Sequence, residues 1–306
     1  QIKTNLLYSL SKKRLQKKNL YVAGNVIIKI KKQISAIYPI KQKLCKKNKT
    51  SSLSINYSNN TITCIDNKKI LAFVLDENKK ITYNTNQSKN IKSAITFKDD
   101  HGKILIIYYQ KYYLYKFNPT KQSSEVYIDK KFLPPFVKYF KKFKEDYHVK
   151  FFKNNRYLGV LIGNAGRYVL NIIDTYTKEV LLKNLLLSSS KINFSNKEVI
   201  YISGSAGKWK LIRYNLNEKE KKIISIFKTI SNIEIFKDGC VIQKNNTITL
   251  YQYDKPKIVV PFTYTLLGKI NNESLIAYKQ FIYPVQFSAL YNTFQTLKSE
   301  IPQLFQ

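Results

Sequence analysis

The chain is poor in the residues that build catalytic and metal sites. Its 306 residues include two histidines, three cysteines, one tryptophan and no methionine. His101 and His148 lie far apart, and no G-x-S-x-G motif is present, which disfavours a hydrolase triad. Cys45, Cys64 and Cys240 show no C-x-x-C spacing. We therefore predict no cofactor and no metal site, and expect three structural thiols, with one disulfide plus a free thiol as the alternative.

Acidic residues are also scarce, with 19 Asp and Glu against 53 Lys and Arg and a formal net charge of +34. The carboxylates that could act in pairs, such as Asp99, Asp100 and Asp174, lie in turn contexts, which disfavours glycoside hydrolysis. The positive charge indicates nucleic acid, lipid head groups or an acidic partner, or else compositional drift in an AT-rich genome. The sequence leaves these readings open.

Long apolar runs are absent, and no stretch approaches the ~20 uninterrupted apolar residues that span a bilayer. We therefore expect no transmembrane segment. The chain begins at Gln1 instead of Met, which indicates either a mature chain whose leader was removed or a trimmed chain. A removed leader would place the protein outside the cytoplasm, so we expect a periplasmic or secreted location.

The abundant residues favour β-strands. Hydrophobic residues make up 44% of the chain, with 24 Tyr and 17 Phe. With only nine Gly and eight Pro, the turns have to rely on asparagine, which tolerates the left-handed backbone region. Asparagine pairs stand at 59–60, 154–155, 245–246 and 271–272.

One pattern, apolar strand, polar turn, apolar strand, repeats from about residue 20 onward. Its clearest copy runs from Ile192 to Ile224 and contains four short strands within about 40 residues, the size of one propeller blade. Poorer or similar copies occupy 20–44, 53–83, 94–128, 148–184, 233–260 and 264–290. We predict an all-β fold, a β-propeller of seven four-stranded blades over residues 20–290; a β-sandwich or two small β-domains are the alternatives.

The unit at residues 192–216, "INFSNKEVIYISG…WKLIRYNL", resembles the repeat of TolB-like propellers. There an F-S-x-D/N turn separates two strands and an L-x-x-x-D/N strand follows. The other units match only loosely, and the Trp-Asp and Gly-His signatures of WD repeats are absent. The resemblance implies a propeller that serves as an extracytoplasmic platform for docking proteins.

Two segments depart from the repeat. In residues 130–147, Leu133, Phe136, Val137, Phe140 and Phe143 recur at helical spacing, which predicts an amphipathic helical insert. Its apolar face either packs on the propeller, the reading we favour, or binds a membrane surface or partner groove. The candidate contacts with a partner or an anionic surface are Lys138, Phe140, Lys141 and Lys142.

The two ends of the chain also differ from the repeat. Residues 291–306 form a predicted C-terminal helical tail, because Leu290, Phe294, Leu297 and Ile301 recur at helical spacing. Residues 1–19 form a basic lead-in. A binding arm is the minority interpretation of that segment.

Together these features predict a non-catalytic β-propeller that acts as a scaffold for protein–protein contacts, and the start at Gln1 leads us to expect it outside the cytoplasm. The alternative is a propeller that binds an anionic polymer or nucleic acid. A hydrolase with its site in the central channel is the third hypothesis. The distribution of basic residues discriminates the first two, because a single basic face favours a polymer.

Overall fold

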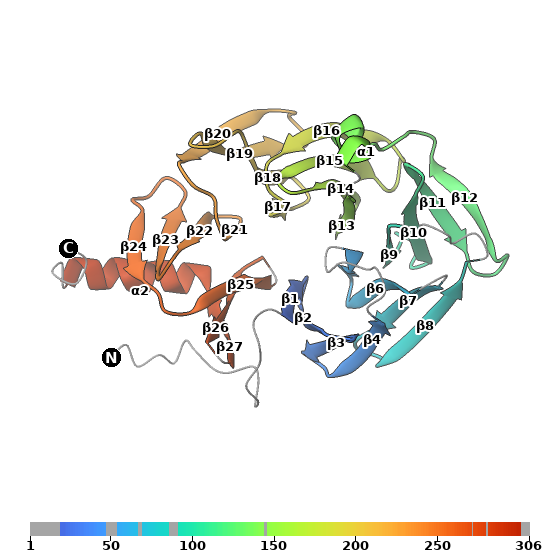
Figure 1. Cartoon of the computed structure of the whole chain (residues 1–306), viewed down its shortest axis with the longest axis horizontal. Coiled ribbons are helices and arrows are strands. Elements are labelled where there is room, and N and C mark those ends of the chain that lie inside the picture. The colour runs from blue at the N-terminus through green and yellow to red at the C-terminus, as the bar shows by residue number, and fades with distance from the viewer. Residues whose placement is uncertain are drawn as a thin grey trace.

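The computed structural model describes residues 19–46, 54–66, 69–85, 91–143, 146–270, 272–279 and 281–300. Seven antiparallel sheets form a ring around a central channel (Figure 1). The predicted β-propeller is therefore confirmed. Six sheets have four strands, and in the seventh the described residues form three.

The first four blades follow the chain in order. Blade 1 comprises β1 (Leu20–Ala23), β2 (Val26–Ile30), β3 (Gln33–Tyr38) and β4 (Gln42–Lys46). Blade 2 comprises β5 (Asn56–Ser58), β6 (Thr61–Asp66), β7 (Lys69–Val74) and β8 (Lys79–Asn84). Blade 3 comprises β9 (Ser93–Lys98), β10 (Ile104–Gln110), β11 (Tyr113–Asn118) and β12 (Ser123–Ile128). Helix α1 (Val137–Phe143) precedes blade 4, which comprises β13 (His148–Asn154), β14 (Tyr157–Asn164), β15 (Arg167–Asp174) and β16 (Val180–Leu187).

The remaining three blades continue the same order. Blade 5 comprises β17 (Ile192–Phe194), β18 (Glu198–Ser203), β19 (Trp209–Asn215) and β20 (Lys221–Phe227). Blade 6 comprises β21 (Ile233–Ile235), β22 (Gly239–Lys244), β23 (Thr247–Gln252) and β24 (Ile258–Pro261). Blade 7 comprises β25 (Thr265–Ile270), β26 (Ser274–Lys279) and β27 (Phe281–Gln286), and helix α2 (Phe287–Glu300) follows it.

Asparagine supplies the tight turns, as its abundance predicted. Asn59, Asn60, Asn155, Asn245 and Asn272 all adopt positive φ angles, between 39° and 57°. This left-handed conformation costs asparagine less than other residues with a side chain, because its short amide bonds locally. The hairpins can therefore close with little glycine.

The core lies between the blades, and each middle strand contributes to two parts of it. In β10, Ile107 and Tyr109 pack with blade 4, whereas Ile106 and Tyr108 pack with blade 2. Successive side chains of a strand point to opposite faces, so a sheet enclosed on both sides needs an unbroken apolar run. This explains why the strand sequences read as continuous instead of alternating.

The ring closes where β25 of blade 7 lies beside β1 of blade 1 (Figure 1). Leu20 and Ile27 of blade 1 form one buried cluster with Ile270 and Ile276 of blade 7. At Gly268 the two blades come so close that an added Cβ atom would stand 3.0 Å from the Cβ atom of Val22. The glycine thus permits the blade-to-blade contact.

The predicted C-terminal helix is present as α2, which begins four residues before the predicted boundary at 291. Phe287 and Tyr291 are buried, and the Phe287 ring stacks on Phe236 of blade 6 at 5.0 Å between centroids. Tyr291 donates a hydrogen bond to the carbonyl oxygen of Pro256 at 2.7 Å. Residue Ile301 and the side chain of Leu297 lie outside the described part.

Asn56 connects three blades at the centre of the ring. Its side chain is buried in β5, and Nδ2 donates to Ser93 Oγ at 2.7 Å and to the Ala94 carbonyl at 2.8 Å, both in blade 3. Its Oδ1 accepts from the backbone N–H of Phe151 in blade 4 at 2.8 Å. No ladder of backbone hydrogen bonds joins one sheet to the next in the described structure. The Asn56 amide therefore supplies hydrogen bonds between the innermost strands of these blades.

We predict that Asn56→Ala lowers the free energy of unfolding by about 3 kcal/mol, because it leaves several buried polar groups without partners. Urea unfolding followed by circular dichroism measures the change. The control is Asn196→Ala in an exposed turn, expected to shift stability by less than about 0.5 kcal/mol. Equal unfolding midpoints for the two variants would contradict the role of Asn56.

Candidate functional site

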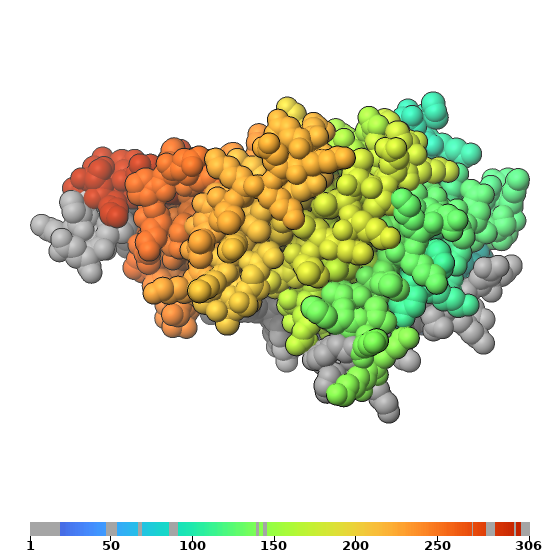
Figure 2. All heavy atoms as spheres, turned by 90° about the horizontal axis from the view of Figure 1, so that it is seen from above, coloured from blue at the N-terminus to red at the C-terminus, as the bar shows by residue number. Residues whose placement is uncertain are grey.

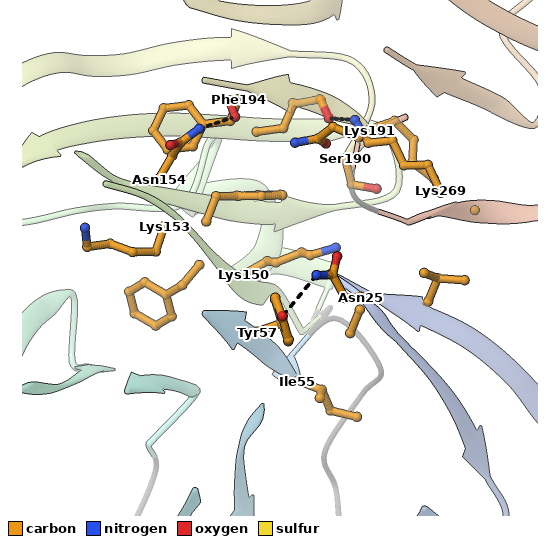
Figure 3. A pocket seen from close by; sticks show the side chains of 18 of the residues that line it. Asn25, Ile55, Tyr57, Lys150, Lys153, Asn154, Ser190, Lys191, Phe194 and Lys269 are labelled. Carbon is orange, nitrogen blue, oxygen red and sulfur yellow. Dashed lines mark hydrogen bonds between the residues drawn. The ribbon is translucent and has the colours of Figure 1, made fainter. Parts of the chain in front are cut away.

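The innermost strands of six blades enclose a cavity of about 240 Å³ in the central channel (Figure 3). The lining residues come from β1, β5, β13, β17, β21 and β25 and the turns beside them. Four lysines are among them, Lys150, Lys153, Lys191 and Lys269, together with one carboxylate, Glu234. The channel is therefore basic where most of the blade core is apolar.

Strand alternation places these charges. In β13, Val149 and Phe151 are buried between blades, while Lys150 and Phe152 occupy the opposite face and line the channel. In β21 Glu234 stands between Ile233 and Ile235, both buried in the ring core. Glu234, the one polar residue of β21, therefore lines the channel.

The carboxylate of Glu234 is buried and forms an ion pair with Lys191. Lys269 Nζ donates to the carbonyl oxygen of Ile192 in blade 5 at 2.9 Å and to that of Ile235 in blade 6. Lys269 therefore connects blade 7 to two other blades. These two lysines both have protein partners.

Lys150 differs from them. Its ammonium group lies 5.2 Å from the centroid of the Phe152 ring, and among the described residues it has neither a hydrogen-bond acceptor nor a carboxylate in ion-pair contact. In Figure 3 its side chain extends into the cavity. The ammonium group of Lys153, three residues further along β13, lies 4.9 Å from the centroid of the Phe97 ring.

Burial lowers the pKa of these lysines, because the charged form loses its hydration. The pKa of Lys269 falls to about 7 through burial, with repulsion from Lys191 and Lys150 adding to the effect and Glu234 opposing it. Burial and the nearby Lys191 lower the pKa of Lys150 to about 8. The pKa values of Lys150 and Lys269 are thus lowered mainly by burial and further by the neighbouring cations.

Neutral donors complete the wall. Asn25 Nδ2 donates to the Tyr57 hydroxyl at 3.1 Å (Figure 3), and that hydroxyl donates to Asn60 Oδ1 at 2.9 Å. On the other side, Asn154 Nδ2 donates to the Phe194 carbonyl at 3.0 Å. These bonds hold residues of blades 1, 2, 4 and 5 at the rim of the cavity.

The sequence-predicted site residues do not line this cavity. Lys138, Lys141 and Lys142 are exposed on α1, and Phe140 belongs to the same helix, though its side chain, like that of Phe143, lies outside the described part. Figure 2 shows α1, in green, projecting from one face of the ring. The predicted insert is helical over Val137–Phe143 only.

The favoured expectation that the apolar face of the insert packs on the ring is wrong for two residues. Leu133 is 41% exposed and Phe136 is 61% exposed. Both precede the helix, because Pro134 and Pro135 and the left-handed φ of 51° at Phe136 delay its start. The helical spacing therefore did not apply to them, and the neighbouring Phe132 is the residue buried in the ring.

The other candidates stay apart from the channel. His101 is exposed beside Asp100, and burial lowers the pKa of His148. Cys45, Cys64 and Cys240 are buried and free, which confirms three structural thiols. Among the described residues no group of three or more His, Cys, Asp or Glu is placed to hold a metal ion, and no helix is long and apolar enough to cross a membrane.

Sequence reasoning missed the channel lysines. Lysine is abundant throughout the chain, so its presence in β13 carried no distinction. Two features of the sequence could have identified the site. One is Lys150 within the apolar segment "HVKFFKN", and the other is Glu234 between two isoleucines. Knowing which strand is innermost in each blade would have identified both as channel residues.

No protein-family model matches the chain, and no curated protein matches it. An oligogalacturonate lyase in complex with manganese is similar in structure, with a TM-score of 0.56 and 6% identity over 92% of this chain and 95% of the lyase. The WD40 domain of Toxoplasma gondii coronin has a TM-score of 0.54 and 13% identity over 92% of this chain and 84% of that one.

TolB from Acinetobacter baumannii has a TM-score of 0.41 and 12% identity over 87% of this chain. The chain spans 63% of TolB, which is less than two thirds of its length. The likeness to a WD40 propeller confirms the predicted propeller fold, and at this identity it extends to the fold alone.

The depressed pKa of Lys269 predicts a pH dependence of stability. The unfolded chain binds a proton at Lys269 up to pH ~10.4, whereas the folded protein releases it near pH 7, so unfolding takes up a proton between these values and stability rises with pH. We expect Lys269→Met to flatten this rise by at least about 1 kcal/mol, since one pKa unit corresponds to ~1.4 kcal/mol.

Urea unfolding at a series of pH values from 6 to 10 measures the effect. The exposed Lys183→Met variant on β16 controls for the loss of one positive charge. Parallel stability profiles for wild type and Lys269→Met would show that the channel environment does not perturb this lysine.

Proposed function

We propose that the chain is a non-catalytic β-propeller that binds an acidic protein partner through the segment around α1. The observation that carries this proposal is the exposure of Leu133 and Phe136 beside three exposed lysines on that segment. Large exposed apolar residues with a charged surround are typical of protein-binding sites, with the aromatic side chain as the anchor.

Contacts of Phe132 with blade 3 hold the segment before α1 in place. Phe132 is fully buried, its N–H donates to the Tyr112 carbonyl at 2.7 Å, and its carbonyl accepts from the Tyr109 hydroxyl at 2.6 Å. Because Phe132 is held by these contacts, the next residue, Leu133, has a defined position on the surface. A preorganised surface loses less entropy on binding.

The backbone at Phe136 supports the same conclusion. Its φ of 51° lies in the left-handed region, which costs a bulky residue about 1–2 kcal/mol. An exposed phenylalanine gains little from burial to offset that cost. Strained and exposed aromatic residues occur where binding, and not stability, selects the side chain.

The charge indicates an acidic protein partner in preference to a membrane. Lys138, Lys141 and Lys142 stand on a seven-residue helix, about two turns, which offers little apolar area to a bilayer. For a protein partner the same ammonium groups accelerate association and set the orientation.

The alternative function, binding of an anionic polymer or nucleic acid, is less well supported by the distribution of lysines. Exposed lysines occupy the edge strands of separate blades, at Lys43 and Lys46 in β4, Lys79 and Lys80 in β8, and Lys221 and Lys222 in β20. Charge on an edge strand prevents pairing with another sheet. Much of the basicity thus has a structural reason in the propeller itself.

Propellers also carry catalysis, as the oligogalacturonate lyase illustrates, so the fold does not choose between scaffold and enzyme. The third hypothesis, a hydrolase in the channel, needs a nucleophile activated by a base. Ser190 and Glu234 both line the channel wall, but in the described structure no hydrogen bond joins them and Glu234 pairs with Lys191. The extracytoplasmic location stays a prediction, which fractionation of the native source tests.

The test uses Phe136→Gly, because glycine relieves the left-handed strain. We expect this variant to be at least as stable as wild type, with a gain of about 0.5–1 kcal/mol, and to lose about 2 kcal/mol of partner binding, or roughly 30-fold in Kd. Affinity capture from the native source identifies the partner, and titration with that purified protein measures Kd.

The matched control is Ile226→Ala on β20, where an equally exposed apolar residue stands on another blade. We expect Ile226→Ala to capture the same partner as wild type. If Phe136→Gly also captures it as well as wild type does, the proposed surface is contradicted. A charge reversal, Lys138→Glu, should slow association with the partner, since it removes attraction and adds repulsion.

A further inference from the structure

We propose that the central channel binds a phosphate group, free or carried by a small metabolite, with Lys150 as its main ligand and Lys191 and Lys269 beside it. This site is separate from the α1 segment, and the proposal does not depend on that function. It rests on the cavity, the arrangement of its charges and the partners of each lysine.

The charges in the cavity do not balance. Lys150, Lys191 and Lys269 interact electrostatically with one another and with a single carboxylate, Glu234. Lys153, the fourth lysine of the lining, lies apart from them over the Phe97 ring. When the three clustered lysines are protonated, three positive charges and one negative charge leave the cluster with a net charge of +2. A phosphate monoester carries about −1.5 to −2 at neutral pH, so one such group neutralises the cluster.

The partners of the lysines show where the group would bind. Glu234 neutralises Lys191, and backbone carbonyls hold Lys269, so both ammonium groups are fixed in direction. Lys150 is the cation of this cluster without a polar partner in the described part of the chain, and it extends into the cavity (Figure 3). Lys150 is only partly exposed, so its ammonium group reaches less water than a surface lysine does and gains from an acceptor that a ligand supplies.

The charge of the cluster favours phosphate over a single carboxylate. Lysine acts as a compact point charge and is a common phosphate ligand, although the planar fork of arginine also matches phosphate. The described lining residues include lysines and no arginine. The lysines come from blades 4, 5 and 7, so they give the channel positive charge on several sides, and a phosphate group carries more negative charge than one carboxylate.

The size of the cavity limits the ligand. At about 240 Å³ the space is far larger than one water molecule needs and smaller than the ~300–1,000 Å³ of pockets for drug-sized ligands. A phosphate group with a small attached moiety is of the right scale. Asn25, Tyr57 and Asn154 at the rim offer neutral polar groups to that moiety.

The lowered lysine pKa values agree with this assignment. Burial and mutual repulsion bring them to about 7 for Lys269 and about 8 for Lys150. A bound dianion removes the repulsion and stabilises the protonated forms. The cluster is thus unfavourable when empty and favourable when an anion is bound, which is the arrangement of a binding site and not of a stabilising ion-pair network.

The experiment compares wild type with Lys150→Met by calorimetric titration with inorganic phosphate and with glycerol 2-phosphate, at constant ionic strength kept with chloride. We expect one saturable site in wild type and at least about tenfold weaker binding in Lys150→Met. Tighter binding of the ester than of free phosphate would identify a phosphorylated metabolite as the ligand, and the reverse order would identify the free ion.

Lys183→Met, which removes an exposed lysine from β16, should bind phosphate as wild type does. Thermal melting gives a second, independent readout. Without phosphate, Lys150→Met should melt at a higher temperature than wild type, because a repelling cation is gone. Phosphate should raise the melting temperature of wild type and of Lys183→Met, and that of Lys150→Met far less.

Three results would overturn the proposal. They are equal phosphate affinity in wild type and Lys150→Met, no saturable binding of either phosphate compound, and an equal loss of binding in Lys183→Met, which would indicate general attraction to a basic protein. Should Lys150→Met fail to fold, Lys150→Gln takes its place, with the same expected loss.

Discussion

The innermost strands of a propeller meet around the channel without a common backbone ladder, and the rest of this structure depends on how they are held. Here polar side chains perform that role. Asn56 bonds blades 2, 3 and 4 together. Gln243 does the same between blades 6 and 7, where Nε2 donates to the Tyr264 carbonyl at 2.6 Å and Oε1 accepts from the Leu266 N–H at 2.8 Å. Each is a side-chain amide that both donates and accepts, so it satisfies two strands at once.

The same constraint accounts for the chemistry of the channel. Lys269 joins three blades by donating to backbone carbonyls, and Glu234 pairs with Lys191 across the gap between blades 5 and 6. Polar groups in an enclosed space are costly unless each has a partner. Lys150 has no polar partner in the described structure, unlike Lys191 and Lys269. We therefore assign Lys150 to the proposed ligand site and the other two lysines to contacts between blades.

Much of the fold could be predicted from the sequence, because its signals are local. The repeat from Ile192 to Ile224 corresponds to the strands of blade 5, and the asparagine pairs mark real turns with positive φ. The C-terminal helix follows from its apolar spacing and packs through Tyr291. Such features depend on neighbours in the chain.

The site could not be predicted in the same way, because it depends on which residues the ring brings together. In β13, Lys150 stands on the less buried face of a strand, and a sequence does not tell whether that face meets solvent or a channel. The prediction for the insert at residues 130–147 was wrong for a different reason. The spacing from Leu133 to Phe143 assumed one continuous helix, but the helix begins at Val137, so Leu133 and Phe136 are exposed before it.

The central claim is that Lys150, which has no polar partner in the described part of the chain, is placed to bind an anion. Diffraction from crystals grown with arsenate, a phosphate analogue with an anomalous signal, tests it most directly. The account predicts an arsenate oxygen within about 2.7–3.2 Å of Lys150 Nζ, inside the channel cavity that Lys150, Lys191 and Lys269 line. Anomalous peaks confined to lysines on the outer surface, with none in the channel, would contradict it.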